Sequence, residues 1–181
     1  MAGERMTEAP ALTTERLLLR PHTHRDFEDV YALWSDPKVV QHISGKPSSR
    51  QESWSRLLRY AGHWTLLGYG YWVVQDRGTA RFLGEVGLAN YRREIEPSFG
   101  ENPEAGWVMA PHAHGRGIAR EAVAAVLAWA DAHLTADHAV CMIAPENAAS
   151  RRLAATVGFR EVGTARYQGE EVVVGERQLG P

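Results

Sequence analysis

The sequence predicts a mixed α/β fold, with a strongly twisted, mostly antiparallel sheet of about seven strands and helices on both faces. Residues 71–74 and 82–88 are two apolar segments separated by a turn, which is typical of an antiparallel hairpin. Residues 105–109, 118–134 and 139–143 follow a strand, helix, strand pattern. That pattern favours one pair of parallel strands joined by a right-handed helical crossover.

Length and composition favour a single cytoplasmic domain. The 181 residues, of which 44% are hydrophobic, are enough for one core. We expect residues 1–11 to form a loose tail and residues 12–181 to form the domain. The 22 acidic and 20 basic residues are mixed along the chain, which argues against nucleic acid as a partner. Cys141 is the only cysteine, so no internal disulfide can form, and no N-terminal apolar segment indicates secretion or a membrane partner.

The first part of the chain predicts a strand followed by two helices. Residues 17–20 form a short apolar strand, and Thr23 with Asp26 resembles a capping box for the next helix. Helical spacing turns four apolar side chains of that helix inward: Phe27, Val30, Tyr31 and Trp34. After a loop at residues 38–50, a second helix is expected at residues 51–64. Its apolar stripe consists of Trp54, Leu57, Leu58 and Ala61.

The middle of the chain contains the strongest helix. The polar residues 90–103 are too many for a plain hairpin connection and are expected to line a pocket. Residues 118–134 repeat an apolar residue every fourth position, which indicates a buried helix. The apolar run at residues 139–143 is typical of a strand covered on both faces.

The last part of the chain predicts one more helix and a hairpin. Asn147 is suited to cap a helix that ends at Gly158. Residues 159–163 and 172–179 then complete the sheet.

The segment with the clearest chemical signal is residues 111–119, between a predicted strand and the strongest helix. Gly115 and Gly117 allow a ligand to approach the backbone, and the helix N-terminus offers unpaired N–H groups to a diphosphate. Arg116 could add a cation at the rim. Two glycines could equally make an ordinary tight turn. A Walker loop would need a Lys, and a dinucleotide fingerprint would need a small residue where Arg120 stands, so both fit poorly.

This segment resembles the pyrophosphate-binding signature of the GNAT superfamily of N-acetyltransferases, a Gln or Arg followed by x-x-G-x-G/A. His114, Gly117 and Ala119 occupy those places, and the His departs from the commonest residue. A second family motif looks similar at Asn147 and Ser150, although spacing alone indicates a helix cap there.

Three further segments look like the RimJ/RimL-like branch, which acetylates the N-termini of ribosomal proteins. They are residues 14–21, 84–87 and 104–108. The resemblance covers the chain from about residue 12 to its C-terminus, and it implies the GNAT acyl-CoA N-acyltransferase fold. In that fold two parallel strands splay apart, here residues 105–109 and 139–143.

The resemblance implies transfer of acetyl from acetyl-CoA to a primary amine, without a metal, by direct attack through a tetrahedral intermediate. The acceptor would be a protein N-terminal α-amine or a small-molecule amine, and the protein a monomer or homodimer. The residues that would contact the cofactor are Val108, Met109, His114, Gly115, Arg116, Gly117, Ile118, Ala119, Asn147 and Ser150.

Two catalytic residues are candidates, Ser150 and Glu104. Many relatives place a Tyr where this chain has Ala154, so Ser150 is the candidate to protonate the departing thiolate. Glu104, Glu85 and Glu170 are candidates for the general base, and each could also be an ordinary carboxylate.

Other interpretations stay open or are less favoured. An apolar setting makes Cys141 an inert buried thiol rather than a nucleophile. His112 and His114 have a spacing that suits a metal but lack further ligands, so loop histidines are favoured. Trp64, Tyr69 and Tyr71 could belong to the core or to the acceptor wall. An acyl-CoA sensor without transfer remains the alternative function, and a nicotinamide oxidoreductase rests on the glycines alone.

Overall fold

The computed structural model describes residues 6–180 of the chain. Its strands are β1 (Leu12–Thr13), β2 (Leu17–Arg20), β3 (Tyr71–Asp76), β4 (Phe82–Ala89), β5 (Ile95–Glu96), β6 (Glu104–Met109), β7 (His138–Ile143), β8 (Arg160–Tyr167) and β9 (Glu170–Gln178). Its helices are α1 (Phe27–Ser35), α2 (Pro37–Val40), α3 (Arg50–Leu67), α4 (Ile118–His133) and α5 (Ala148–Thr156), with 3-10 turns at His24–Asp26 and Pro111–Ala113.

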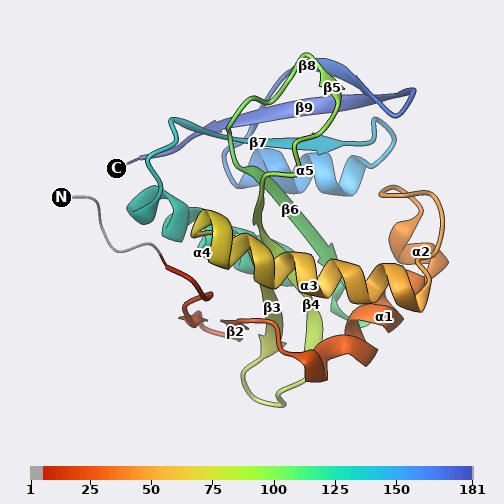
Figure 1. Cartoon of the computed structure of the whole chain (residues 1–181), viewed down its shortest axis with the longest axis vertical. Coiled ribbons are helices and arrows are strands. Elements are labelled where there is room, and N and C mark those ends of the chain that lie inside the picture. Colours follow the sequence, from red (N-terminus) through yellow and green to blue (C-terminus); the bar gives the residue numbers. More distant parts are fainter. Residues whose placement is uncertain (1–5, 181) are drawn as a thin grey trace.

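The strands of the described residues form one sheet in the order β1-β2-β3-β4-β6-β7-β9-β8-β5 (Figure 1). Only β6 and β7 are parallel, and every other neighbouring pair is antiparallel. The predicted mostly antiparallel sheet with one parallel pair is therefore confirmed. The sheet holds more strands than expected because the two-residue strands β1 and β5 extend its edges.

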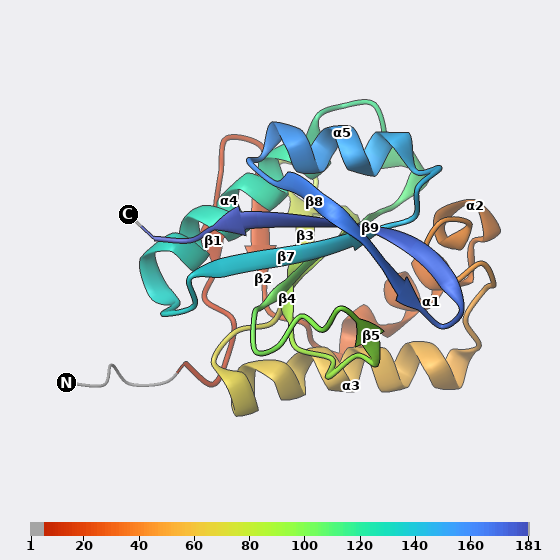
Figure 2. The same ribbon diagram turned by 90° about the horizontal axis from the view of Figure 1, so that it is seen from above.

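Helices cover both faces of the sheet. Figure 2 shows α1 and α3 along one side of the sheet and α4 and α5 along the other. On the α1 and α3 side, a hydrophobic cluster reaches Val108 of β6. On the α4 side, a larger cluster includes Met109, the next residue of the same strand. The end of β6 is therefore fixed between both layers.

The buried face of α3 differs from the predicted stripe. Trp54 and Leu58 were expected to face inward, but their exposed fractions are 39% and 52%. The helix instead buries Tyr60 and Trp64, whose rings lie 4.3 and 4.7 Å from the centroids of aromatic rings on β3. The prediction was right for Leu57, which is buried, and wrong for Trp54, Leu58 and the exposed Ala61. The larger rings near the end of the helix find partners on the sheet, and such contacts dominate core packing.

Residues 38–50 are not entirely a loop, because α2 forms at their start. Pro37 stands at the first helical position, and the Asp36 carboxylate accepts a hydrogen bond from the backbone N–H of Lys38 at 2.8 Å. Both features favour a helical turn. The following helix begins where Ser49 caps it by accepting a backbone N–H bond at 3.2 Å.

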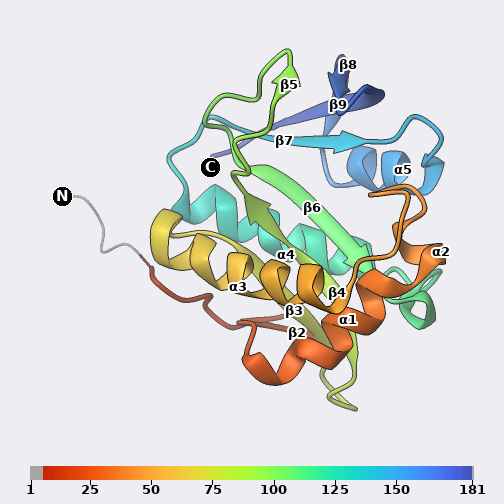
Figure 3. The same cartoon turned by 45° about the vertical axis from the view of Figure 1, so that its right-hand side comes forward.

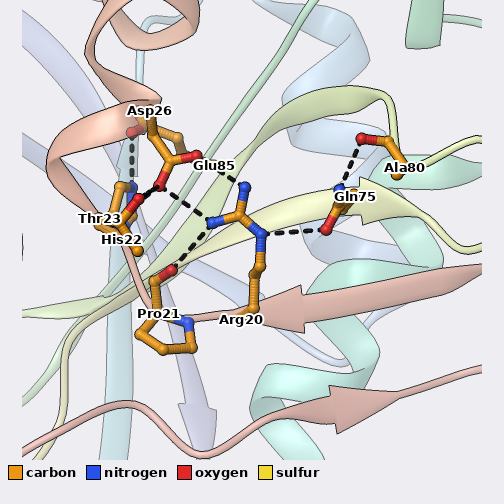
Figure 4. Close-up of polar contacts among 8 residues, drawn as sticks. All are labelled: Arg20, Pro21, His22, Thr23, Asp26, Gln75, Ala80 and Glu85. Atoms are coloured by element: carbon orange, nitrogen blue, oxygen red, sulfur yellow. Dashed lines mark hydrogen bonds and ion pairs between the residues drawn. The ribbon is translucent and has the colours of Figure 1, made fainter.

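The corner between β2 and α1 is held by a buried carboxylate (Figure 4). The Thr23 backbone N–H donates to Asp26 at 2.7 Å, which confirms the predicted cap, and Arg20 donates two bonds to the same carboxylate at 2.7 and 3.0 Å. Burial raises the pKa of Asp26, but the bonds from Arg20 and Thr23 outweigh it, so that the pKa is lowered.

The predicted tail, residues 1–11, lies partly outside the described residues, which begin at Met6. In its described part, Ala9 is buried and the Pro10 carbonyl accepts a 2.8 Å bond from the Trp72 indole. The division into a tail and a domain at residues 12–181 stays a prediction.

Candidate active site

The sheet opens between β6 and β7. The two strands pair only at Glu104 and Val140, near the beginning of β6, and diverge from there (Figure 3). On its other side β7 pairs with β9 along its whole length, so β7 follows β9 rather than β6. Gly106 and Trp107 are partly exposed although they lie mid-strand in the sheet. The opening therefore exposes the middle of β6.

The glycine loop lies beyond the end of β6 and leads into α4. Gly115 and Gly117 have φ of +71° and +73°, which favours glycine, and the loop from His114 to Gly117 is exposed. No side chain caps α4, so its first N–H groups stay available to an anion. Ile118 is 1% exposed and anchors the start of the helix. Only the backbone of Ile118 and Ala119 is therefore placed to meet a ligand.

Arg16 is a residue of this loop region that sequence reasoning missed. Its guanidinium donates to the Arg116 carbonyl at 2.8 Å and to the Glu121 carboxylate at 2.7 Å. A Cβ on Gly117 would lie 3.5 Å from the same guanidinium. Burial raises the pKa of Glu121, but hydrogen bonds from Thr14 and Arg16 outweigh it and lower the pKa. Arg16 therefore braces the loop and brings a second cation to it.

The N-terminus of α5 faces the opening. Asn147 caps the helix, because its Oδ1 accepts the Ser150 backbone N–H at 3.1 Å, so the capping interpretation is confirmed. The Ser150 hydroxyl accepts a bond from the Trp107 indole at 3.3 Å. Ser150 therefore stands next to β6, whereas the Asn147 amide is engaged in the cap.

The structure separates the three candidate acids. Glu104 begins β6, and its two carboxylate oxygens accept bonds from Arg93 at 2.6 and 2.9 Å. Burial lowers the pKa of Arg93, but the hydrogen bonds and negative charge of Glu104 have the larger effect, so that the Arg93 pKa is raised. Glu85 is fully buried, with His22 and the Trp34 indole each 2.7 Å from its oxygens. Of the three, only Glu104 belongs to a strand of the opening, at the position where β6 still pairs with β7.

Glu170 belongs to neither strand of the opening. It is exposed at the beginning of β9, across the turn from Tyr167.

An aromatic wall lies on the α3 side of β6. Tyr60 and Tyr71 stack with ring centroids 4.3 Å apart, and a Cβ on Gly106 would lie 1.9 Å from the Tyr71 hydroxyl. Burial raises the pKa of Tyr71 well above 10.0. Three aromatic residues could belong to the core or to the acceptor wall. Tyr71 lies against β6, Trp64 belongs to the core and Tyr69 is half-buried. The backbone of β6 therefore meets the Tyr71 hydroxyl at its exposed midpoint.

The connection from β4 to β6 lines a hollow, as predicted for residues 90–103. The hollow measures about 210 Å³ and includes Tyr91, Arg93, Glu101 and Glu104 in its wall. Because Glu104 begins β6, this hollow adjoins the opening of the sheet.

Cys141, His112 and His114 each have a defined place in the described residues. Cys141 is 1% exposed, and burial raises its pKa to about 12. His112 and His114 lie 3.0 and 2.9 Å from backbone carbonyls of Phe82 and Met109. No group of three metal-ligating side chains occurs within residues 6–180, and no helix there is long and apolar enough to cross a membrane.

Comparison with known proteins shows which family this chain resembles. A family model described as an acetyltransferase (GNAT) domain matches residues 16–160. The N-acetyltransferase YoaA of Bacillus subtilis is 26% identical over 161 residues, which cover 87% of this chain and 86% of YoaA. A GnaT-family acetyltransferase structure from Bordetella pertussis is 30% identical with a TM-score of 0.82, covering 93% of this chain and 99% of that chain. RimL, a ribosomal L7/L12 α-N-protein acetyltransferase in complex with coenzyme A, shares the fold at 16% identity and a TM-score of 0.76, covering 94% and 98%.

Proposed function

The chain belongs to the GNAT acetyltransferase family, and from this premise we propose that it transfers acetyl from acetyl-CoA to a primary amine. The acceptor is the α-amine of a protein N-terminus or the amine of a small molecule. The observation that carries the proposal is the opening between β6 and β7, because it exposes strand backbone directly beside the uncapped N-terminus of α4.

The residues around the opening fit acetyl-CoA. The N–H groups from Gly115 to Ala119 suit its pyrophosphate, because exposed glycines with positive φ lead there into an uncapped helix. His114 and Arg116 stand at the rim of this loop. The parted edge of β6 near Val108 and Met109 suits the extended pantetheine arm, which can pair with strand backbone. Asn147 and Ser150 border the arm from α5.

The reaction would be accelerated mainly by holding the amine and the thioester in the right geometry. Acetyl-CoA supplies a thioester, and backbone N–H groups near Val108 and Met109 would stabilise the oxyanion formed when the amine attacks. Holding the amine and the thioester in line can contribute about 7–11 kcal/mol. Ser150 is the proposed proton donor to the leaving thiolate, because its hydroxyl already reaches Trp107 on β6.

We assign Glu104 the task of accepting the proton of the amine, through water. An ionised carboxylate offers about four lone pairs, and Arg93 uses two of them. Glu104 is also the one of the three candidate acids that lines the hollow beside the opening. An α-amine, with a pKa near 8, needs little help to lose its proton at neutral pH.

Calorimetric titration with acetyl-CoA tests the proposal, comparing the native protein with Gly117→Trp. Gly169→Trp is the matched control, because Gly169 also has a positive φ of +85° and open space around it but lies in the β8–β9 turn. Binding that is lost only in Gly117→Trp supports the cofactor site. Absence of binding in the native protein refutes the function. Binding without turnover of any amine would instead favour an acyl-CoA sensor.

A further inference from the structure

The carboxylates in the wall of the hollow beside β6 are each neutralised by an arginine. Two carboxylates line it, Glu101 and Glu104. Each already pairs with an arginine, Glu101 with Arg92 and Glu104 with Arg93 at 2.6 Å. The wall of the hollow is therefore balanced in charge.

The rim of the hollow carries a cation without such a partner. Arg59 is exposed on α3, and its guanidinium carbon lies 5.1 Å from the centroid of the Tyr91 ring. Tyr91 lines the hollow, and the guanidinium carbon of Arg93 also lies over its ring, 4.5 Å from the centroid. Among residues 6–180, Arg59 has no carboxylate within ion-pair distance. Its donors are therefore available to a ligand.

A second arginine on the same helix repeats this pattern. Arg56 stacks over the Trp34 ring at 3.5 Å, and its nearest polar contact is a long 3.4 Å bond to the Ser48 hydroxyl. It also pairs with no carboxylate in the described part of the chain. Helix α3 therefore carries two arginines, three positions apart, that pair with no carboxylate in the described residues.

The spacing along β6 connects this charge to the reaction centre. Gly106, at the opening, lies two residues from Glu104 on the same face of the strand, which is roughly 7 Å. An amine bound at the exposed edge of Gly106, beside the Tyr71 hydroxyl, would direct the next part of its chain toward the hollow. The wall of the hollow includes Tyr91, the ring that Arg59 contacts.

We propose that this hollow and Arg59 form an acceptor subsite that selects primary amines with a carboxylate close to the amine, such as the N-terminus of an acidic peptide. The inference rests on the proposed acetyl transfer. An anionic acceptor gains the unpaired guanidinium, whereas a polyamine meets that cation and finds no free carboxylate on the wall. Arg59 would therefore favour anionic acceptors by attraction and disfavour cationic acceptors by repulsion.

The experiment uses three pentapeptides that begin with a free alanine and differ only at the next two positions, which are Glu, Gln or Lys. Spermidine is the fourth acceptor. We expect kcat/KM to fall in the order Glu, Gln, Lys, with spermidine below the Glu peptide. Arg59→Gln should reduce the ratio of the Glu to the Gln peptide about threefold to tenfold, mainly through KM, and Arg59→Glu should reverse the order.

Arg81→Gln is the matched control. Arg81 is exposed just before β4, at the opposite end of that strand from Ala89 in the hollow. It should leave the order of the peptides unchanged. Equal rates for the three peptides, no turnover of any of them, or faster turnover of spermidine than of the Glu peptide would overturn the inference. Loss of acetyl-CoA binding in the native protein would instead overturn the proposed function, so the two failures are distinguishable.

Discussion

Gly106 allows a quantitative test of how β6 fits the aromatic wall. A Cβ at this position would lie 1.9 Å from the Tyr71 hydroxyl, whereas ordinary contact begins at 3.4 Å, so Gly106→Ala lacks 3.4 − 1.9 = 1.5 Å of room. Tyr71 cannot retreat freely, because it is 6% exposed and stacks on the buried Tyr60 at 4.3 Å. We therefore expect Gly106→Ala to lower the free energy of unfolding by about 1–3 kcal/mol, the usual cost of overpacking.

A double-mutant cycle with Tyr71→Phe isolates the cause. Without the hydroxyl, the nearest atom to the new Cβ is the ring carbon at 3.2 Å, and the shortfall drops to 3.4 − 3.2 = 0.2 Å. Tyr71→Phe alone should cost about 1 kcal/mol, because it removes the side-chain hydrogen bond between Tyr71 and Tyr91. The loss in free energy of unfolding of the double variant, measured by urea unfolding, should be smaller than the sum of the losses of the two single variants by more than ~0.5 kcal/mol. Additivity within ~0.5 kcal/mol would refute the steric reasoning.

Three further predictions concern other parts of the site and fold. Ser150→Ala should lower kcat about 100-fold, since it removes a proposed proton donor, and should weaken acetyl-CoA binding much less; unchanged kcat in steady-state assays would contradict that role. Cys141, whose pKa burial raises to about 12, should resist thiol-labelling reagents at pH 8 until the protein is denatured, and rapid labelling of the native protein would show that the thiol is accessible. Asp26→Asn should lower the free energy of unfolding by about 3 kcal/mol at pH 7, because it breaks a buried pair with Arg20. The folded-state pKa of Asp26 is lowered, so its contribution is present above the unfolded pKa of about 3.9 and is lost as pH falls below it. Unfolding curves of the two proteins should therefore converge in acid.

The sequence was sufficient for features that depend on neighbours along the chain. The strand, helix, strand unit of β6, α4 and β7 was predicted because hydrophobic periodicity reports local structure directly. The Asn147 cap was predicted for the same reason, since the residue bonds a backbone N–H only three positions away. Where both partners lie within a few residues, the pattern of the sequence contains the interaction.

Contacts between segments that lie far apart along the chain could not be predicted from the sequence pattern. Arg16 reaches Glu121 across 105 positions, and the pairing of Glu104 with Arg93 follows from how the connection to β6 folds back. The buried Glu85 is a further example, because nothing in its neighbourhood along the chain indicates that His22 and Trp34 meet it in the core. Sequence reasoning found Glu104 and Glu85 as candidates but had no signal for what surrounds them, and it did not single out Glu121.

The placement of these polar contacts explains why the opening can remain a site for chemistry. Buried carboxylates with partners hold the α1 and α3 side of the sheet, at Asp26 and Glu85, so that the wall behind β6 is fixed. The parallel edge of β6, by contrast, pairs with β7 at one position only. Backbone N–H and C=O groups require partners, and Gly106, a residue without a side chain, is partly exposed on this strand. An extended acyl arm that supplies those partners gains hydrogen bonds from a strand that is already in place, and most of its ordering cost falls on the ligand rather than on the protein.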